Sequence, residues 1–297
     1  MRLLHFVRND LLVFFRRQKI VSPQIQQIIE AALAEDIGTG DITTGATVSP
    51  KKKGRAQAMA KGDFVIAGLE VFEAVFHAVD KDIRVKKIIS DGNKAKKGDI
   101  IAEVKGSLSG ILQAERVALN LLQRMSGIAT LTAKYVETVR KTKAKILDTR
   151  KTVPGLRVLD KMAVRIGGGT NHRTGLYDGV LIKDNHIEAA GGITAAVHAQ
   201  RTRLSHHLKI EVETKNILEV KEALKCRADI IMVDNMTVDA MKKAVDFVAG
   251  RALLEASGNV NLGSVAQIAA TGVDLISVGE LTHSVRAADI SLKVKGR

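Results

Sequence analysis

The sequence predicts an α/β protein in which an N-terminal α+β sandwich domain precedes a (β/α) barrel-like domain with six or seven parallel strands. In the second half of the chain, short apolar runs alternate with stretches of helical spacing, a pattern typical of parallel strands joined by crossover helices. A polar residue follows each apolar run, as at the mouth of a barrel, where the active site lies. The pattern therefore favours a closed barrel over an open doubly wound sheet.

Residues 1–22 are predicted to be an N-terminal extension, either a leading helix or a frayed segment. The apolar run at residues 11–15 is too short for the core of a signal peptide.

A helix is predicted over residues 23–36, because Ser22 can cap its first turn and Pro23 suits its first position.

Residues 23–122 are assigned to the sandwich domain, because turn signals separate several strand-like segments in this part of the chain. These strands are expected at residues 54–66, 83–89 and 100–104. A long helical stretch, residues 109–135, connects the sandwich to the barrel domain, residues 123–297. Packing of the C-terminal end back on the sandwich domain is a further option.

The barrel strands are predicted from apolar runs that are long enough to be buried strands and too short to be helices. They are expected at residues 146–147, 179–182, 210–212, 230–233, 252–256 and 275–278. Amphipathic stretches such as residues 216–225 and 238–248 are expected to be helices between them.

Composition narrows the class of protein. The chain has 297 residues and one cysteine, Cys226, so an internal disulfide is impossible and we expect a reducing, cytoplasmic location. No apolar run approaches the roughly 18 residues that span a bilayer, so no membrane partner is expected. A net charge of +14 raises the question of nucleic acid, but the chain has no Trp and only 3% aromatic residues for stacking on bases. We therefore expect an enzyme with no nucleic-acid partner.

Residues 148–186 form a basic segment around three consecutive glycines, Gly167, Gly168 and Gly169. Such a segment suits a site that collects a small ligand with several negative charges, and the glycines are expected to let the loop close. The alternative is a solvated basic loop. The cationic side chains of the segment are Arg150, Lys151, Arg157, Lys161, Arg165, His172, Arg173 and Lys183.

Several motifs resemble those of quinolinate phosphoribosyltransferase, also called nicotinate-nucleotide pyrophosphorylase (carboxylating). The central ones are DTRKTVPGLR at 148–157, GGG at 167–169 followed by NHR at 171–173, and KDNH at 183–186. Others match the family's pattern on either side: EAALAEDIGTGDITT at 30–44, ERVALN at 115–120, SGIAT at 126–130, EVE at 211–213, DNM at 234–236 and EASG at 255–258. The resemblance spans nearly all of residues 23–285.

This resemblance implies an enzyme, a pentosyltransferase of NAD biosynthesis, that needs Mg²⁺. It would convert quinolinate and phosphoribosyl pyrophosphate into nicotinate mononucleotide, pyrophosphate and CO₂. Quinolinate carries two adjacent carboxylates, which cations and especially arginines bind well. The residues implied to bind it are Arg116, Arg150, His172, Arg173 and Lys183. Family likeness further implies that Arg116 reaches the site of a neighbouring subunit, so the active unit would be at least a homodimer.

The second substrate carries phosphates and a ribose. Small residues after the last barrel strands can bring backbone N–H groups close to phosphates. The residues predicted to bind phosphoribosyl pyrophosphate are Thr149, Lys151, Glu213, Asp234, Ser257, Gly258, Asn259, Val278, Gly279 and Glu280. The catalytic residues are predicted to be Lys151, Glu213 and Asp234, and the carboxylates of Glu213 and Asp234 are expected to bind Mg²⁺ directly or through water.

Two other functions remain open at this point. A related phosphoribosyltransferase could act on a monocarboxylate such as nicotinate, although the number of cations favours a dicarboxylate. A basic barrel could also bind anions without catalysis, but pure anion binding gains nothing from Glu213 and Asp234.

Overall fold

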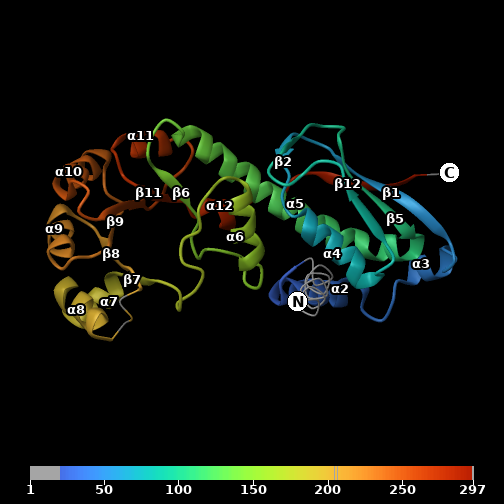
Figure 1. Ribbon diagram of the computed structural model, residues 1–297, viewed down its shortest axis with the longest axis horizontal. Coiled ribbons are helices and arrows are strands. Elements are labelled where there is room, and N and C mark those ends of the chain that lie inside the picture. The colour runs from blue at the N-terminus through green and yellow to red at the C-terminus, as the bar shows by residue number, and fades with distance from the viewer. Residues whose placement is uncertain (1–20, 204, 206, 296–297) are drawn as a thin grey trace, which may run out of the picture.

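A computed structural model describes residues 21–203, 205 and 207–295 (Figure 1). Residues 1–20 of the predicted extension lie outside this described part of the chain. The molecule has an antiparallel sheet at one end and a parallel sheet at the other, joined by one long helix (Figure 1). The predicted mixed α/β class, with a small N-terminal domain and six parallel strands in the C-terminal one, is confirmed.

The N-terminal domain is built on a four-stranded antiparallel sheet in the order β12-β1-β5-β3. In β1 every second residue from Ala56 to Ala60 is buried, the period expected of a strand with one face on a core. Strand β12 comes from the far end of the described chain, so this N-terminal sheet is completed by a C-terminal strand. The strands are β1 (Lys53–Ala60), β3 (Arg84–Lys87), β5 (Ile100–Ser107) and β12 (Ile290–Lys295), with β2 (Phe64–Val65) paired to β4 (Lys94–Ala95) in a separate ladder.

Three helices pack in the same domain: α2 (Pro23–Ile37), α3 (Ile42–Thr47) and α4 (Leu69–Val79). Helix α2 begins as expected, since Ser22 caps it and Pro23 occupies its first turn. Helix α5 (Leu108–Val139) then runs from this domain to the parallel sheet. Because its buried side chains contact both ends, one hydrophobic core extends through the molecule. None of the helices in the described residues has the length and apolar character needed to cross a lipid bilayer.

The C-terminal domain contains six parallel strands in the order β6-β11-β10-β9-β8-β7. They are β6 (Lys145–Leu147), β7 (Val180–Ile182), β8 (Ile210–Thr214), β9 (Ile230–Asp234), β10 (Leu253–Ser257) and β11 (Leu275–Ser277). The helices are α6 (Arg157–Ile166), α7 (Asp184–Ala190), α8 (Ile193–Arg203), α9 (Ile217–Lys225), α10 (Val238–Val248), α11 (Val265–Ala270) and α12 (Glu280–His283).

The ladder of parallel strands is interrupted at one seam of the barrel-like domain. Within the described residues, β6 and β7 do not pair, and a single parallel bridge joins Leu147 to Thr170 there. The segment between these two strands contains helix α6 and the three glycines, and its residue Thr170 makes this bridge beside β6.

The glycine loop packs closely against the long helix α5. A Cβ atom at Gly167 would lie 2.5 Å from the carbonyl oxygen of Ala129, and one at Gly169 would lie 2.8 Å from the Thr132 side chain. Both neighbours belong to α5. The glycines therefore allow this loop to approach the long helix closely.

Candidate active site

A cavity of about 890 Å³ lies at the C-terminal ends of the parallel strands. Its lining residues follow or end strands β6 to β11, the position expected for a barrel site. Among the predicted site residues, those that line it are Thr149, Arg150, Lys151, His172, Arg173, Lys183, Glu213, Asp234, Ser257, Gly258, Asn259, Gly279 and Glu280.

Two predicted site residues do not line this cavity. Arg116 lies on α5 with an exposed side chain. Val278 is fully buried, and its backbone N–H already donates to the carbonyl oxygen of Leu147 at 2.9 Å. The N–H of Val278 is therefore not free for a phosphate, and Arg116 does not reach the cavity of its own chain.

One part of the lining is cationic and lacks fixed counter-ions. Arg150 and Arg173 both line the cavity, and within the described residues neither has a carboxylate oxygen within 4.0 Å. The Nε of Arg150 is buried without a hydrogen-bond partner. Burial and the charge of Arg150 both lower the pKa of Arg173, which indicates two like charges in a poorly solvated place. An anionic ligand would relieve both conditions.

The loop that carries Arg173 is fixed by a buried ion pair. Lys161 Nζ lies 2.6 Å from Asp148 Oδ1, and Asp148 also accepts the backbone N–H of His172 at 2.8 Å and the side-chain amide of Asn171. Burial raises the pKa of Asp148, while Lys161 and the other donors oppose that rise. Lys161 therefore supports the loop and is not a ligand-binding cation.

Two more cations of the basic segment are also structural. Arg157 donates to Thr152 Oγ1 and to the carbonyl oxygen of Thr174, both at 3.0 Å. Arg165 donates to Asn171 Oδ1 at 2.7 Å. Neither arginine lines the cavity, so only part of the predicted positive charge faces a ligand.

The carboxylates of the cavity come from neighbouring strands. Glu213 lies on β8, with its Oε2 in an ion pair 3.3 Å from Lys183 Nζ, and Asp234 ends β9. Both carry oxygen donors and line the same cavity, and such a set is acceptable to Mg²⁺, which keeps several waters when bound to one or two carboxylates.

The other end of the cavity is formed by small and amide residues. Gly258 and Asn259, directly after β10, both have positive φ, at 93° and 50°. Asn259 Nδ2 donates to Asn235 Oδ1 at 3.1 Å, which ties this turn to the one after β9. Glu280 accepts from the hydroxyl of Tyr135 on α5, so its carboxylate is held from outside the cavity.

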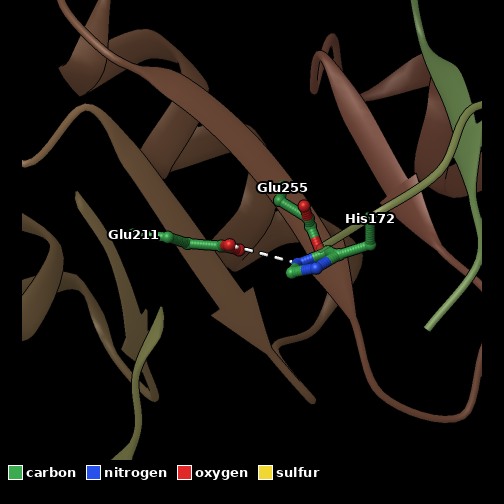
Figure 2. Close-up of side chains that lie close together, drawn as sticks. All are labelled: His172, Glu211 and Glu255. Atoms are coloured by element: carbon green, nitrogen blue, oxygen red, sulfur yellow. Dashed lines mark ion pairs between the residues drawn. The ribbon is translucent and has the colours of Figure 1, made fainter. Parts of the chain in front are cut away.

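His172, Glu211 and Glu255 form a buried cluster that was not predicted as a unit. His172 and Glu255 line the cavity, and Glu211 lies behind them. Figure 2 shows both carboxylates directed at the His172 ring, with Nε2 3.1 Å from Glu211 Oε2 and 3.6 Å from Glu255 Oε1. Glu211 was missed, although its spacing of two residues from Glu213 places both on one face of β8. Glu255 could have been noticed as a carboxylate within an apolar strand.

Burial and neighbouring charges shift the pKa values of this cluster. Burial and the charge of Glu211 raise the pKa of Glu255 to about 8. Burial lowers the pKa of His172, but the carboxylates of Glu211 and Glu255 outweigh it and raise that pKa. A second contact opposes this, because His172 Nδ1 accepts the backbone N–H of Arg173 at 2.7 Å. A nitrogen that accepts a hydrogen bond carries no proton, so this geometry favours the neutral ring with its proton on Nε2.

Comparison with known proteins covers almost the whole described chain. The family model described as quinolinate phosphoribosyl transferase, C-terminal domain, matches residues 128–293, and the corresponding N-terminal domain model matches residues 41–126. Quinolinate phosphoribosyltransferase [decarboxylating] 1 of Nicotiana glauca is 46% identical over 289 residues, with 91% of this chain and 82% of that protein covered. The probable nicotinate-nucleotide pyrophosphorylase [carboxylating] of Bacillus subtilis (strain 168) is 42% identical, with 91% of this chain and 93% of that protein covered. The crystal structure of NadC from Streptococcus pyogenes superposes with a TM-score of 0.90 at 38% identity, covering 94% of this chain and 99% of that one.

Proposed function

The chain belongs to the quinolinate phosphoribosyltransferase family, and from this we propose that it transfers the phosphoribosyl group of phosphoribosyl pyrophosphate to quinolinate with decarboxylation. The products are nicotinate mononucleotide, pyrophosphate and CO₂, and the step belongs to NAD biosynthesis. The structural observation that carries this assignment is the pair of guanidinium groups of Arg150 and Arg173, which line the cavity without carboxylate counter-ions.

We assign quinolinate to this cationic part of the cavity. Its two adjacent carboxylates match the forked donors of Arg150 and Arg173, and Lys183 adds a third positive charge. Nicotinate, with one carboxylate, would leave part of this charge unpaired. The dicarboxylate is therefore the better fit of the two acceptors.

We assign phosphoribosyl pyrophosphate to the part formed by the turns after β10 and β11, with Lys151 beside Gly279. Glu213 and Asp234 are the residues that would hold Mg²⁺, directly or through water. When bound, the ion supplies positive charge that stabilises the leaving pyrophosphate.

The chain's own residues contribute position and charge rather than a nucleophile. Arg150 and Arg173 would orient quinolinate so that its ring nitrogen can displace pyrophosphate at the anomeric carbon, and Lys151 would take up charge on the leaving group. The positive ring nitrogen of the product then stabilises the carbanion left when the neighbouring carboxylate departs as CO₂. The fixed positive charges that line the cavity favour both steps.

We further propose a homo-oligomer, at least a dimer, in which Arg116 completes the quinolinate site of a neighbouring subunit. Its exposed position on α5, outside the cavity of its own chain, supports this. We also propose a cytoplasmic location, since the free thiol of Cys226 suits a reducing compartment.

The test is to incubate the purified protein with quinolinate, phosphoribosyl pyrophosphate and Mg²⁺ and to follow nicotinate mononucleotide and CO₂, with nicotinate as a parallel acceptor. We expect product from quinolinate and at least a hundredfold loss of kcat/KM in Arg173→Ala, as for loss of a charged contact to a reacting ligand. Turnover of nicotinate alone would overturn the substrate, and no turnover of either acceptor would overturn the activity.

A further inference from the structure

The His172 ring lines the cavity, but both of its nitrogens are engaged by the protein itself. Nδ1 accepts the backbone N–H of Arg173 at 2.7 Å, and Nε2 lies 3.1 Å from Glu211 Oε2 and 3.6 Å from Glu255 Oε1. A hydrogen bond from His172 to a substrate would require one of these contacts to break. If His172 affects the binding of quinolinate, it does so by a route other than a hydrogen bond from its ring to the substrate.

A metal ion in this cluster is disfavoured by the same geometry. Binding a metal through Nε2 requires that the ring proton sit on Nδ1. The N–H of Arg173 points at Nδ1, so a proton there would face another donor. The contacts instead suit a ring whose Nε2–H faces Glu211 Oε2 at 3.1 Å, with Glu255 beside it at 3.6 Å.

The main chain of His172 is held as firmly as its ring. Its backbone N–H donates to Asp148 Oδ1 at 2.8 Å, and its carbonyl oxygen accepts from Lys161 Nζ at 2.9 Å. The next residue is Arg173, whose guanidinium donates to the carbonyl oxygen of Gly179 at 3.2 Å. The ring itself is linked to Arg173 by the hydrogen bond from the Arg173 backbone N–H to Nδ1, and displacement of the ring would break this bond.

Glu255 has an unusual place for a carboxyl group. It is 1% exposed, and its Oε1 has no hydrogen-bond partner that meets the usual geometry. Burying such a group is costly, and an apolar side chain would fill β10 at lower cost. Burial and the neighbouring Glu211 raise the pKa of Glu255 to about 8, so an ionised carboxylate is disfavoured in this place. The placement makes sense if the carboxyl has a task at the ring.

We propose that Glu255, together with Glu211, is a positioning residue that holds the His172 ring and through it Arg173, and so sets the affinity for quinolinate without touching it. This inference rests on the proposed function, because it takes Arg173 to bind quinolinate. It assigns His172 the role of a link between the carboxylates and Arg173.

The test compares two variants of matched length. Glu255→Gln keeps oxygen and hydrogen-bonding capacity, and Glu255→Met removes both. We expect Glu255→Met to raise KM for quinolinate about tenfold, the usual size for loss of a supporting contact, and to leave KM for phosphoribosyl pyrophosphate within about twofold. Glu255→Gln should stay within about twofold of the wild type in both constants.

A double-mutant cycle separates positioning from general damage. If Glu255 acts only through Arg173, then adding Glu255→Met to Arg173→Ala should change KM for quinolinate less than about twofold. An equal effect in both backgrounds, or an equal rise in KM for phosphoribosyl pyrophosphate, would overturn the proposal. Failure of the wild type to use quinolinate would instead remove the proposed function, and this inference with it.

A measurement on the wild type keeps the proposal open to refutation if Glu255→Met does not fold. Nitrogen NMR of protein with ¹⁵N-labelled histidine, assigned by comparison with His172→Gln, reports which ring nitrogen carries the proton. We expect the neutral form with hydrogen on Nε2. A proton on Nδ1 would contradict the link between His172 and Arg173.

Discussion

Lys161 Nζ lies 2.6 Å from Asp148 Oδ1 in the interior, where Asp148 is fully buried and Lys161 is only 3% exposed. Asp148 directly follows β6 and Lys161 lies on α6, so the pair fastens the start of the basic segment to its helix. The same two side chains bind the backbone of His172. Lys161, which the sequence groups with the cations of the basic segment, therefore belongs with Asp148 to the structural framework that holds Arg173 in place.

We expect Lys161→Met to lower the free energy of unfolding by about 3 kcal/mol, because it leaves Asp148 buried without its cation. Urea denaturation measures this. The control is Lys143→Met, since Lys143 lies at the same 2.6 Å distance from Asp274 but is 59% exposed. That variant should lose at most about 1 kcal/mol. Equal losses in the two variants would show that burial of the Asp148 pair has no special effect.

Features of the fold that depend on neighbouring residues could be predicted from the sequence, whereas features that depend on contacts between distant residues could not. Strands β8 and β9 were predicted within two residues, because strands buried on both faces appear as continuous apolar runs. The segment expected as one strand at 54–66 divides into β1 and β2 at the polar turn of Lys61, Gly62 and Asp63, a local signal that the prediction overlooked. The pairing of β12 with β1 depends on contacts across the whole chain, and no local pattern encodes it.

The same contrast between local and long-range features applies to the residues of the candidate site. Residues such as Asp234 and Ser257 were predicted because they end apolar runs, and the structure brings them to one cavity. The partners of His172 were missed, because choosing Glu211 and Glu255 requires the direction of each side chain and the order of the strands. The structural use of Lys161 likewise depends on burial, which charge alone does not reveal.

The guanidinium of Arg150 predicts a difference between arginine and lysine at the same charge. Because lysine offers a point charge and no fork, we expect Arg150→Lys to raise KM for quinolinate at least about tenfold, with KM for phosphoribosyl pyrophosphate nearly unchanged. Steady-state kinetics with each substrate varied in turn measures both. Arg84→Lys, on the exposed face of β3, serves as control and should leave both constants within error. An Arg150→Lys enzyme with wild-type KM for quinolinate would remove Arg150 from the binding site.

The raised pKa of Glu255 predicts how stability varies with pH. Between its ordinary value of 4.5 and about 8, the folded state retains a proton that the unfolded state has lost. The wild type should therefore lose stability as pH rises through this window, whereas Glu255→Gln has no such group to titrate. We expect the variant to gain about 1–3 kcal/mol relative to the wild type between pH 5 and pH 8. Urea denaturation at several pH values tests this, and parallel curves for the two proteins would refute it.

Gly258 gives a prediction for the phosphate end of the cavity. Its φ is +93°, and a Cβ atom there would lie 2.2 Å from Asn235 Oδ1 and 2.8 Å from the backbone nitrogen of Asn235. Alanine should push Asn235 away and break its hydrogen bond with Asn259. We therefore expect Gly258→Ala to raise KM for phosphoribosyl pyrophosphate about tenfold or more, with a loss of about 1–3 kcal/mol in stability.

The control for Gly258 must carry the same backbone strain without the collision. Gly250 meets this need, because its φ is +75° and a Cβ atom there would have no heavy atom within 4 Å. Gly250→Ala should lose stability from strain alone and keep the wild-type KM for phosphoribosyl pyrophosphate. If Gly258→Ala also kept that KM, the turn after β10 would not bind the phosphoribosyl substrate. If both variants raised it equally, strain in the fold, and not the position of Asn235, would be the cause.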